Sequence, residues 1–75
     1  MKRMVDIVMG AMRAVAENGY ARFEENGLDV VMPTVPDSPE EVDVGILIDT
    51  HRLISGDYKP GTVEVDNDGS WRWLR

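Results

Sequence analysis

A chain of 75 residues, 43% of them hydrophobic and 29% charged, can bury one small core but not two, so we expect a single domain over residues 1–75. The net charge of −6 has the wrong sign for a protein that neutralises phosphates, which argues against nucleic acid as a partner. With no cysteine and one histidine, the chain can form neither a disulfide nor a zinc site of thiolates and imidazoles.

So small a core leaves only a few kcal/mol of net stability, and with disulfides and zinc excluded the remaining supports are tight packing and self-association. We therefore expect a homodimer. No apolar run approaches the roughly 20 residues that span a bilayer, and an acidic surface repels anionic lipid, so no membrane role is expected. Asp6 and Arg13 interrupt the apolar residues after Met1-Lys2-Arg3, so the start does not read as a signal peptide and a cytoplasmic protein is expected.

An amphipathic helix is predicted from Met4 to about Asn18. Its apolar residues recur at intervals of three and four positions, as on one face of a helix: Met4, Val8, Ala11, Met12 and Val15. The charged residues Asp6, Arg13 and Glu17 fall together on the opposite side. Gly19 follows the helix, where the left-handed conformation of a helix end favours glycine.

A β-hairpin is predicted next, with strands Tyr20–Glu25 and Leu28–Met32 around Asn26-Gly27. This dipeptide best satisfies the two positive φ angles of a type I′ turn. An alternative continues the first helix through Tyr20–Glu25 to a cap at Gly27, and periodicity alone does not exclude it. A glycine at position 19 inside that longer helix would cost about 1 kcal/mol.

The middle of the chain is predicted to hold a proline connector and then one long strand. Pro33, Pro36 and Pro39 recur every third residue and favour an extended crossing, with room for one helical turn at Ser38. From Val42 to Asp49 apolar and other residues alternate with a period of two, which predicts a strand. A loop with at most one helical turn is expected from Thr50 to Gly61.

A second hairpin is predicted at the end of the chain, with strands Thr62–Asp66 and Trp71–Arg75 around Asn67-Asp68-Gly69-Ser70. The whole pattern indicates an α+β fold. We expect the N-terminal amphipathic helix to pack on a small antiparallel sheet of four to five strands, made of two hairpins and one central strand.

The sequence Asp66-Asn67-Asp68-Gly69 has the alternating acidic residues of a calcium-binding loop. If Glu64 is taken as the first position of such a loop, the twelfth position, which should be a bidentate glutamate, is Arg75. The same residues suit a tight hairpin turn, which is the interpretation we favour. No metal or cofactor site is predicted.

His51 is the one candidate general base, because Asp49, two residues earlier, would share its face on a strand and could orient it. No nucleophile accompanies the pair, since Ser38, Ser55 and Ser70 all lie in turn or cap contexts. We therefore expect no enzyme and no small-molecule substrate. A small enzyme subunit using His51 with Asp49 remains an alternative.

The candidate partner-binding residues are Trp71, Arg72, Trp73 and Arg75. Two tryptophans on one face of a strand and two arginines on the other bring together residue types that are enriched at interfaces. A terminal strand can also be a sheet edge, whose free backbone groups pair with another chain. The competing interpretation, which we favour for the rings, is that both close the core against Val63, Val65 and the N-terminal helix.

The sequence therefore predicts a small, acidic, non-enzymatic interaction module that binds a protein partner or itself. One form of it is a regulator whose carboxylates cover a basic surface of its target, with salt-sensitive association. A structural subunit of a larger assembly is the other alternative.

Overall fold

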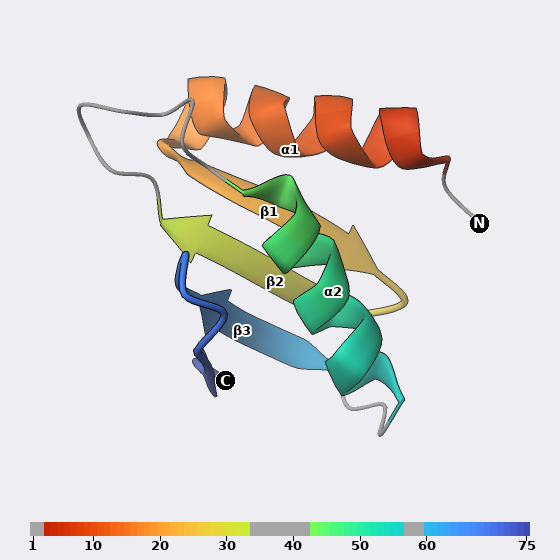
Figure 1. The fold of residues 1–75 in the computed structure, drawn as a ribbon, viewed down its shortest axis with the longest axis vertical. Helices are drawn as coiled ribbons and strands as arrows, with labels where there is room; N and C mark the ends of the chain where they lie inside the picture. Colours follow the sequence, from red (N-terminus) through yellow and green to blue (C-terminus); the bar gives the residue numbers. More distant parts are fainter. Residues whose placement is uncertain (1–2, 34–42, 57–59) are drawn as a thin grey trace.

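The fold is α+β, with two helices and a four-stranded mixed sheet (Figure 1). The structure is a computed structural model, and it describes residues 3–33, 43–56 and 60–75. The elements in chain order are α1 (Met4–Asn18), β1 (Tyr20–Glu25), β2 (Leu28–Pro33), α2 (Val44–Ser55), β3 (Gly61–Val65) and β4 (Trp71–Trp73). The proline connector and the helical turn expected at Ser38 lie outside the described residues.

Helix α1 has the bounds that its periodicity predicts. Gly19 ends it in the left-handed region, with φ +78°, and donates its backbone N–H to the Val15 carbonyl oxygen at 3.0 Å. The chain turns at this point into β1, so the alternative of a helix continued through Tyr20–Glu25 is wrong. A left-handed glycine breaks the run of right-handed φ and ψ angles on which a longer helix depends.

The first hairpin is also confirmed. Asn26 and Gly27 both have positive φ, of 56° and 83°, as a two-residue type I′ turn requires. Glu25 lies opposite Leu28 in the register, and the antiparallel pairing runs to Tyr20 opposite Pro33.

The strand predicted over Val42–Asp49 is wrong, because residues 44–55 form helix α2. Asp43 caps the helix by accepting a hydrogen bond from the Ile46 backbone N–H at 3.2 Å. The residues that α2 buries are spaced as one face of a helix: Leu47, Ile48, Thr50, His51 and Ile54. The alternation of apolar and other residues stops at Asp49. When the polar residues after Asp49 are included, the buried positions recur at the spacing of a helix.

The sheet is not antiparallel throughout, as the sequence led us to expect. Strands β2 and β3 run parallel, while β1 with β2 and β3 with β4 are antiparallel. The cause is α2, because a helix between two strands carries the chain back so that the second strand starts from the same end as the first. Where a central strand was predicted, the chain makes a crossover.

The closing hairpin is confirmed, with β3 at Gly61–Val65 and β4 at Trp71–Trp73. In its turn the Gly69 backbone N–H donates to the Asp66 carbonyl oxygen at 2.9 Å, and the Asp66 N–H donates to the Ser70 carbonyl oxygen at 2.8 Å. Past β4, the N–H groups of Leu74 and Arg75 both approach the Thr62 carbonyl oxygen, at 2.8 and 3.4 Å, so two residues oppose one in a β-bulge.

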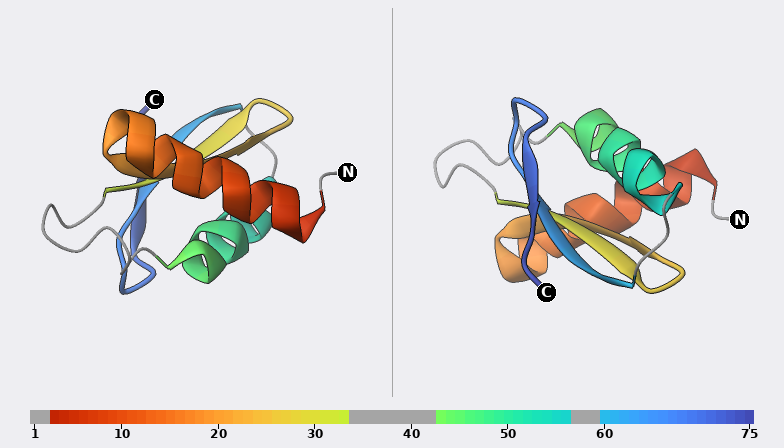
Figure 2. Two further views of the ribbon diagram at one scale, coloured as in Figure 1. Left: turned by 90° about the horizontal axis from the view of Figure 1, so that it is seen from above. Right: turned by 90° about the horizontal axis from the view of Figure 1, so that it is seen from below.

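One face of the sheet carries the core. Its fully or nearly buried residues come from three strands and both helices: Ala11, Ala21, Phe23, Leu28, Val30, Met32, Leu47, Ile48, Ile54, Val63 and Val65. Helix α2 lies over this face and α1 lies alongside β1, as Figure 2 shows from above and from below. Among the described residues neither helix is long and apolar enough to cross a bilayer.

Candidate functional site

Strand β4 is an edge of the sheet, because the strand order is β1-β2-β3-β4. Toward β3, the Ser70 carbonyl oxygen accepts from Asp66 and the Leu74 N–H donates to Thr62, and Arg72 lies opposite Glu64 between them. Backbone groups alternate in direction along an antiparallel strand. The N–H and C=O groups of Trp71 and Trp73 therefore point away from β3, toward an edge that no other strand among the described residues covers.

The two tryptophan side chains lie on the core face of the sheet, since Trp71 is paired with Val65 and Trp73 with Val63. The two valines are fully buried, whereas each tryptophan is 40% exposed. The rings stand edge to face, with centroids 6.3 Å apart and an interplanar angle of 85°. Both rings thus extend the core to its border and present much of their surface to solvent.

The two arginines do not join them. Arg72 lies on the opposite, open face, where its guanidinium forms an ion pair with Glu64. Arg75 belongs to the bulge, and its carbonyl oxygen accepts a hydrogen bond from the Thr62 N–H at 3.0 Å. The four residues predicted from the sequence therefore lie on the edge strand or just after it. The aromatic rings are on the core face of the sheet, and the charge is on the other face.

A groove lies between α2 and the β3–β4 hairpin, beside Trp71. Its volume is about 290 Å³, and it is lined by Ile46, Asp49, Thr50, Leu53, Gly69 and Trp71. Leu53 is 69% exposed, so the groove has an exposed leucine, an exposed indole and Asp49 in its lining. The sequence interpretation missed Leu53 because it placed residue 53 in a loop rather than on a helix.

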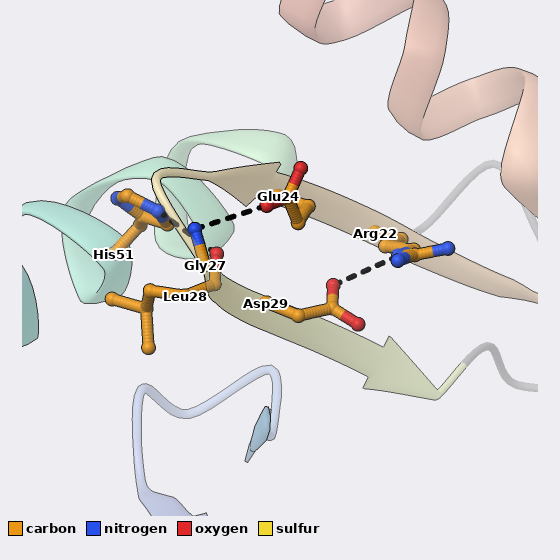
Figure 3. Close-up of polar contacts among 6 residues, drawn as sticks. All are labelled: Arg22, Glu24, Gly27, Leu28, Asp29 and His51. Carbon is orange, nitrogen blue, oxygen red and sulfur yellow. Dashed lines mark hydrogen bonds and ion pairs between the residues drawn. The ribbon is translucent and has the colours of Figure 1, made fainter. Parts of the chain in front are cut away.

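The open face of the sheet has a hollow of about 430 Å³ that is lined by both polar and apolar side chains. Arg22 on β1 donates to Asp29 on β2 at 2.9 Å (Figure 3), and this hydrogen bond and the carboxylate's charge raise the pKa of the Arg22 guanidinium. The Glu24 carboxylate accepts from the Gly27 N–H at 3.1 Å. These charges satisfy one another and mark a solvated face.

His51 is buried in the core, with 5% of its surface exposed. Its Nε2 lies 3.2 Å from the Leu28 carbonyl oxygen, which can only accept, so Nε2 carries the proton and donates. The imidazole also packs against the Phe23 ring, with ring centroids 4.4 Å apart and the planes tilted by 36° (Figure 3 shows the bond to Leu28). Asp49, two residues earlier on the same helix, is exposed and lines the groove, so the structure does not bring the two together.

The acidic residues of the last turn hold the turn itself. Asp68 accepts hydrogen bonds from the Ser70 N–H at 2.9 Å and from the Ser70 hydroxyl at 2.6 Å. The pKa of the Asp68 carboxyl is lower than its usual value. The hydrogen bond from the Ser70 hydroxyl is the larger cause, and the bond from the Ser70 backbone N–H is the next. Glu64 pairs with Arg72 instead of facing the turn. Within residues 3–33, 43–56 and 60–75 no three His, Asp or Glu side chains gather where they could hold a metal ion.

The sequence matches no protein-family model, and neither curated proteins nor solved structures gave a significant match. The geometry of the chain is therefore the basis for any functional argument. It offers an edge strand with outward backbone groups, two half-exposed indoles and a groove lined by Leu53 and Trp71.

Proposed function

We propose that this chain is a non-enzymatic interaction module that binds an extended segment of a partner protein along the free edge of β4. The observation that carries the proposal is the outward direction of the backbone N–H and C=O groups of Trp71 and Trp73, next to exposed apolar surface. An unpaired edge is a template for one more strand, and backbone hydrogen bonds supply affinity in that mode of recognition.

The groove supplies a preference for particular side chains. Successive residues of an added strand point to opposite faces, so every second side chain of the partner would lie on the core face beside Trp71 and Leu53. The lining is apolar at those two residues and anionic at Asp49. A partner strand that alternates apolar residues with lysine or arginine suits this edge, because its apolar side chains bury area beside Trp71 and Leu53. Its cations, which point to the other face, are attracted by the net charge of −6.

The charge of the whole chain supports the same class of partner. With a net charge of −6, the module attracts basic segments at long range and repels acidic ones. Association should therefore weaken as salt is added, since the Debye length falls to about 8 Å at physiological ionic strength. The proposal places the module in the cytoplasm, whose reducing conditions suit a chain without cysteine.

The test uses a synthetic peptide, acetyl-Lys-Val-Lys-Val-Lys-Val-amide, and the full chain labelled with ¹⁵N. We expect the largest amide shifts at Trp71 and Trp73, and a matching change in tryptophan fluorescence. The same peptide with alternate backbone nitrogens methylated cannot donate along one edge, so it should bind at least tenfold more weakly. Equal binding of the two peptides, or shifts confined to other strands, would refute strand addition at β4.

Two substitutions on α2 locate the groove. Leu53→Lys replaces an exposed apolar side chain by a cation and should weaken peptide binding at least tenfold without unfolding the protein. Arg52→Ala, at the neighbouring exposed position, is the matched control and should leave binding within about twofold. If both variants bind the peptide like the wild type, the groove beside Trp71 takes no part in recognition.

A further inference from the structure

Helix α1 contributes little to the core of its own chain. It packs mainly against β1, and Ala11 is its one buried residue among those described. Ile7 and Val15 are only partly buried against the core. In Figure 1, α1 lies at the top of the described fold, with the sheet and α2 below it.

The exposed side of α1 is strongly apolar. Five large apolar side chains of this helix are between 37% and 57% exposed: Met4, Val5, Val8, Met9 and Met12. With the exposed Ala16 they form a continuous surface that we name the α1 apolar face. Exposed apolar side chains gathered on one helix face in this way mark a contact site more often than single exposed apolar residues do.

The spacing on this face is that of a helix pair. Val5, Met9, Met12 and Ala16 follow one another at intervals of four, three and four residues, the a and d spacing of a coiled-coil seam. Methionine fills irregular gaps between packed helices, and Ala16 permits close approach at one end. The seam covers twelve residues, about 17 Å of helix, so it needs the sheet behind it to hold the helix in place.

The charges beside the seam indicate what covers it. Asp6 and Arg13 both directly follow a d position, at Val5 and Met12, and so lie on the same flank of the seam, seven residues apart. Asp6 has an exposed ion pair with Arg3, at 3.5 Å. Arg13 makes no ion pair with another residue that the structure describes.

A second copy of this chain fits the arrangement when the two helices run antiparallel. In an antiparallel pair related by a two-fold axis, like flanks face each other, so Asp6 of one copy meets Arg13 of the other and Arg13 meets Asp6. With Met9 layered against Met12 of the second copy, each ion pair is offset by two residues, about 3 Å, which an arginine spans. A parallel pair would set Asp6 and Arg13 against the apolar flank at Val8 and Val15.

We propose that the chain forms a homodimer through the α1 apolar face, with two antiparallel α1 helices joined by Asp6–Arg13 ion pairs across a two-fold axis. This interface lies beside β1, at the opposite edge of the sheet from β4. It is therefore independent of the edge that the proposed function uses, and either one can fail without the other.

The experiment measures the mass of the full chain by sedimentation from 1 to 100 µM, with charge variants on the flank. The wild type is expected to have the mass of two chains. Asp6→Arg and Arg13→Asp each set like charges against each other, so each variant alone should associate at least tenfold more weakly. An equimolar mixture of the two variants restores both opposite-charge pairs and should recover the mass of two chains.

Matched controls separate this interface from net charge and from the β4 edge. Arg52→Asp, on the exposed side of α2, changes the net charge as Arg13→Asp does and should leave the dimer intact. The α1 variants should keep the wild-type circular dichroism spectrum and still bind the lysine-valine peptide.

Three results would overturn the proposal. The first is a single-chain mass for the wild type at every concentration. The second is two-chain mass for both single variants, which would place the contact elsewhere, for example between two β4 edges. The third is failure of the mixed variants to associate, which would exclude the antiparallel pairing.

Discussion

The packing at the start of β3 makes Gly61→Ala a sharp test of the C-terminal hairpin. A Cβ atom at this position would overlap the carbonyl oxygen of Arg75 and would lie 3.1 Å from a ring carbon of Trp73. Gly61 also has φ +154°, a backbone conformation that side chains rarely adopt. The methyl group therefore strains residue 61 or displaces the residues of the bulge.

The magnitude follows from the cheaper of these two responses. Keeping the bulge in place costs about 1–3 kcal/mol of backbone strain. Letting Leu74 and Arg75 detach gives up the hydrogen bonds that join them to Thr62, each worth about 0.5–1.5 kcal/mol. Because the cheaper response sets the cost, we expect a loss of about 1–3 kcal/mol in the free energy of unfolding, or on the order of 10 °C in Tm for a domain of this size.

The assay is urea denaturation followed by tryptophan fluorescence, since Trp73 lies at the site. Gly10→Ala is the matched control, because Gly10 is exposed within α1 and a Cβ there meets nothing within 4 Å. Alanine favours the helix, so this variant should gain about 0.5–1 kcal/mol. A Gly61→Ala stability within about 0.5 kcal/mol of the wild type would refute the packing described for the hairpin.

Two further predictions concern the core and the last turn. Leu47→Ala removes a fully buried side chain and should lower the free energy of unfolding, measured by urea denaturation, by about 2–5 kcal/mol. Leu53→Ala, at a 69% exposed position on the same helix, should lower it by less than about 1 kcal/mol. Equal losses would contradict the assigned buried face of α2. Ser70→Ala removes the larger cause of the low Asp68 pKa, so NMR titration should find that pKa raised toward its ordinary value. Because the pKa is lowered in the fold, the wild-type turn is stabilised above the unfolded-state pKa, and this stabilisation is lost as the pH falls through the folded-state value. The variant keeps the backbone hydrogen bond from residue 70, so its pH dependence should be smaller than that of the wild type.

Local signals determined the parts of the fold that the sequence predicted well. Gly19 and Asn26-Gly27 require backbone conformations that few residues adopt, so they located the end of α1 and the first hairpin regardless of what packs around them. Helix α2 was missed because its first residues, Val44 to Ile48, are β-branched or apolar at alternate positions. Burial by the sheet outweighs that weak β-propensity.

The wrong prediction of a strand at 42–49 led to a second error, in the direction of the strands. A strand at 42–49 would have kept the whole sheet antiparallel, whereas a helix makes β2 and β3 parallel. The candidate edge at Trp71 and Trp73 was predicted from residue type and position, but the groove beside it was not. Leu53 and Asp49 reach that groove only because α2 places both on its exposed side.

The strand order also decides what a paired molecule would offer to its surroundings. Helix α1 lies beside the first strand of the sheet and β4 forms the last, so a contact through α1 leaves each β4 outermost. Such a pair would be bivalent, with two identical ends that face away from the axis. A target carrying two suitable segments on one chain would then be held by avidity, since capture of the first raises the effective concentration of the second.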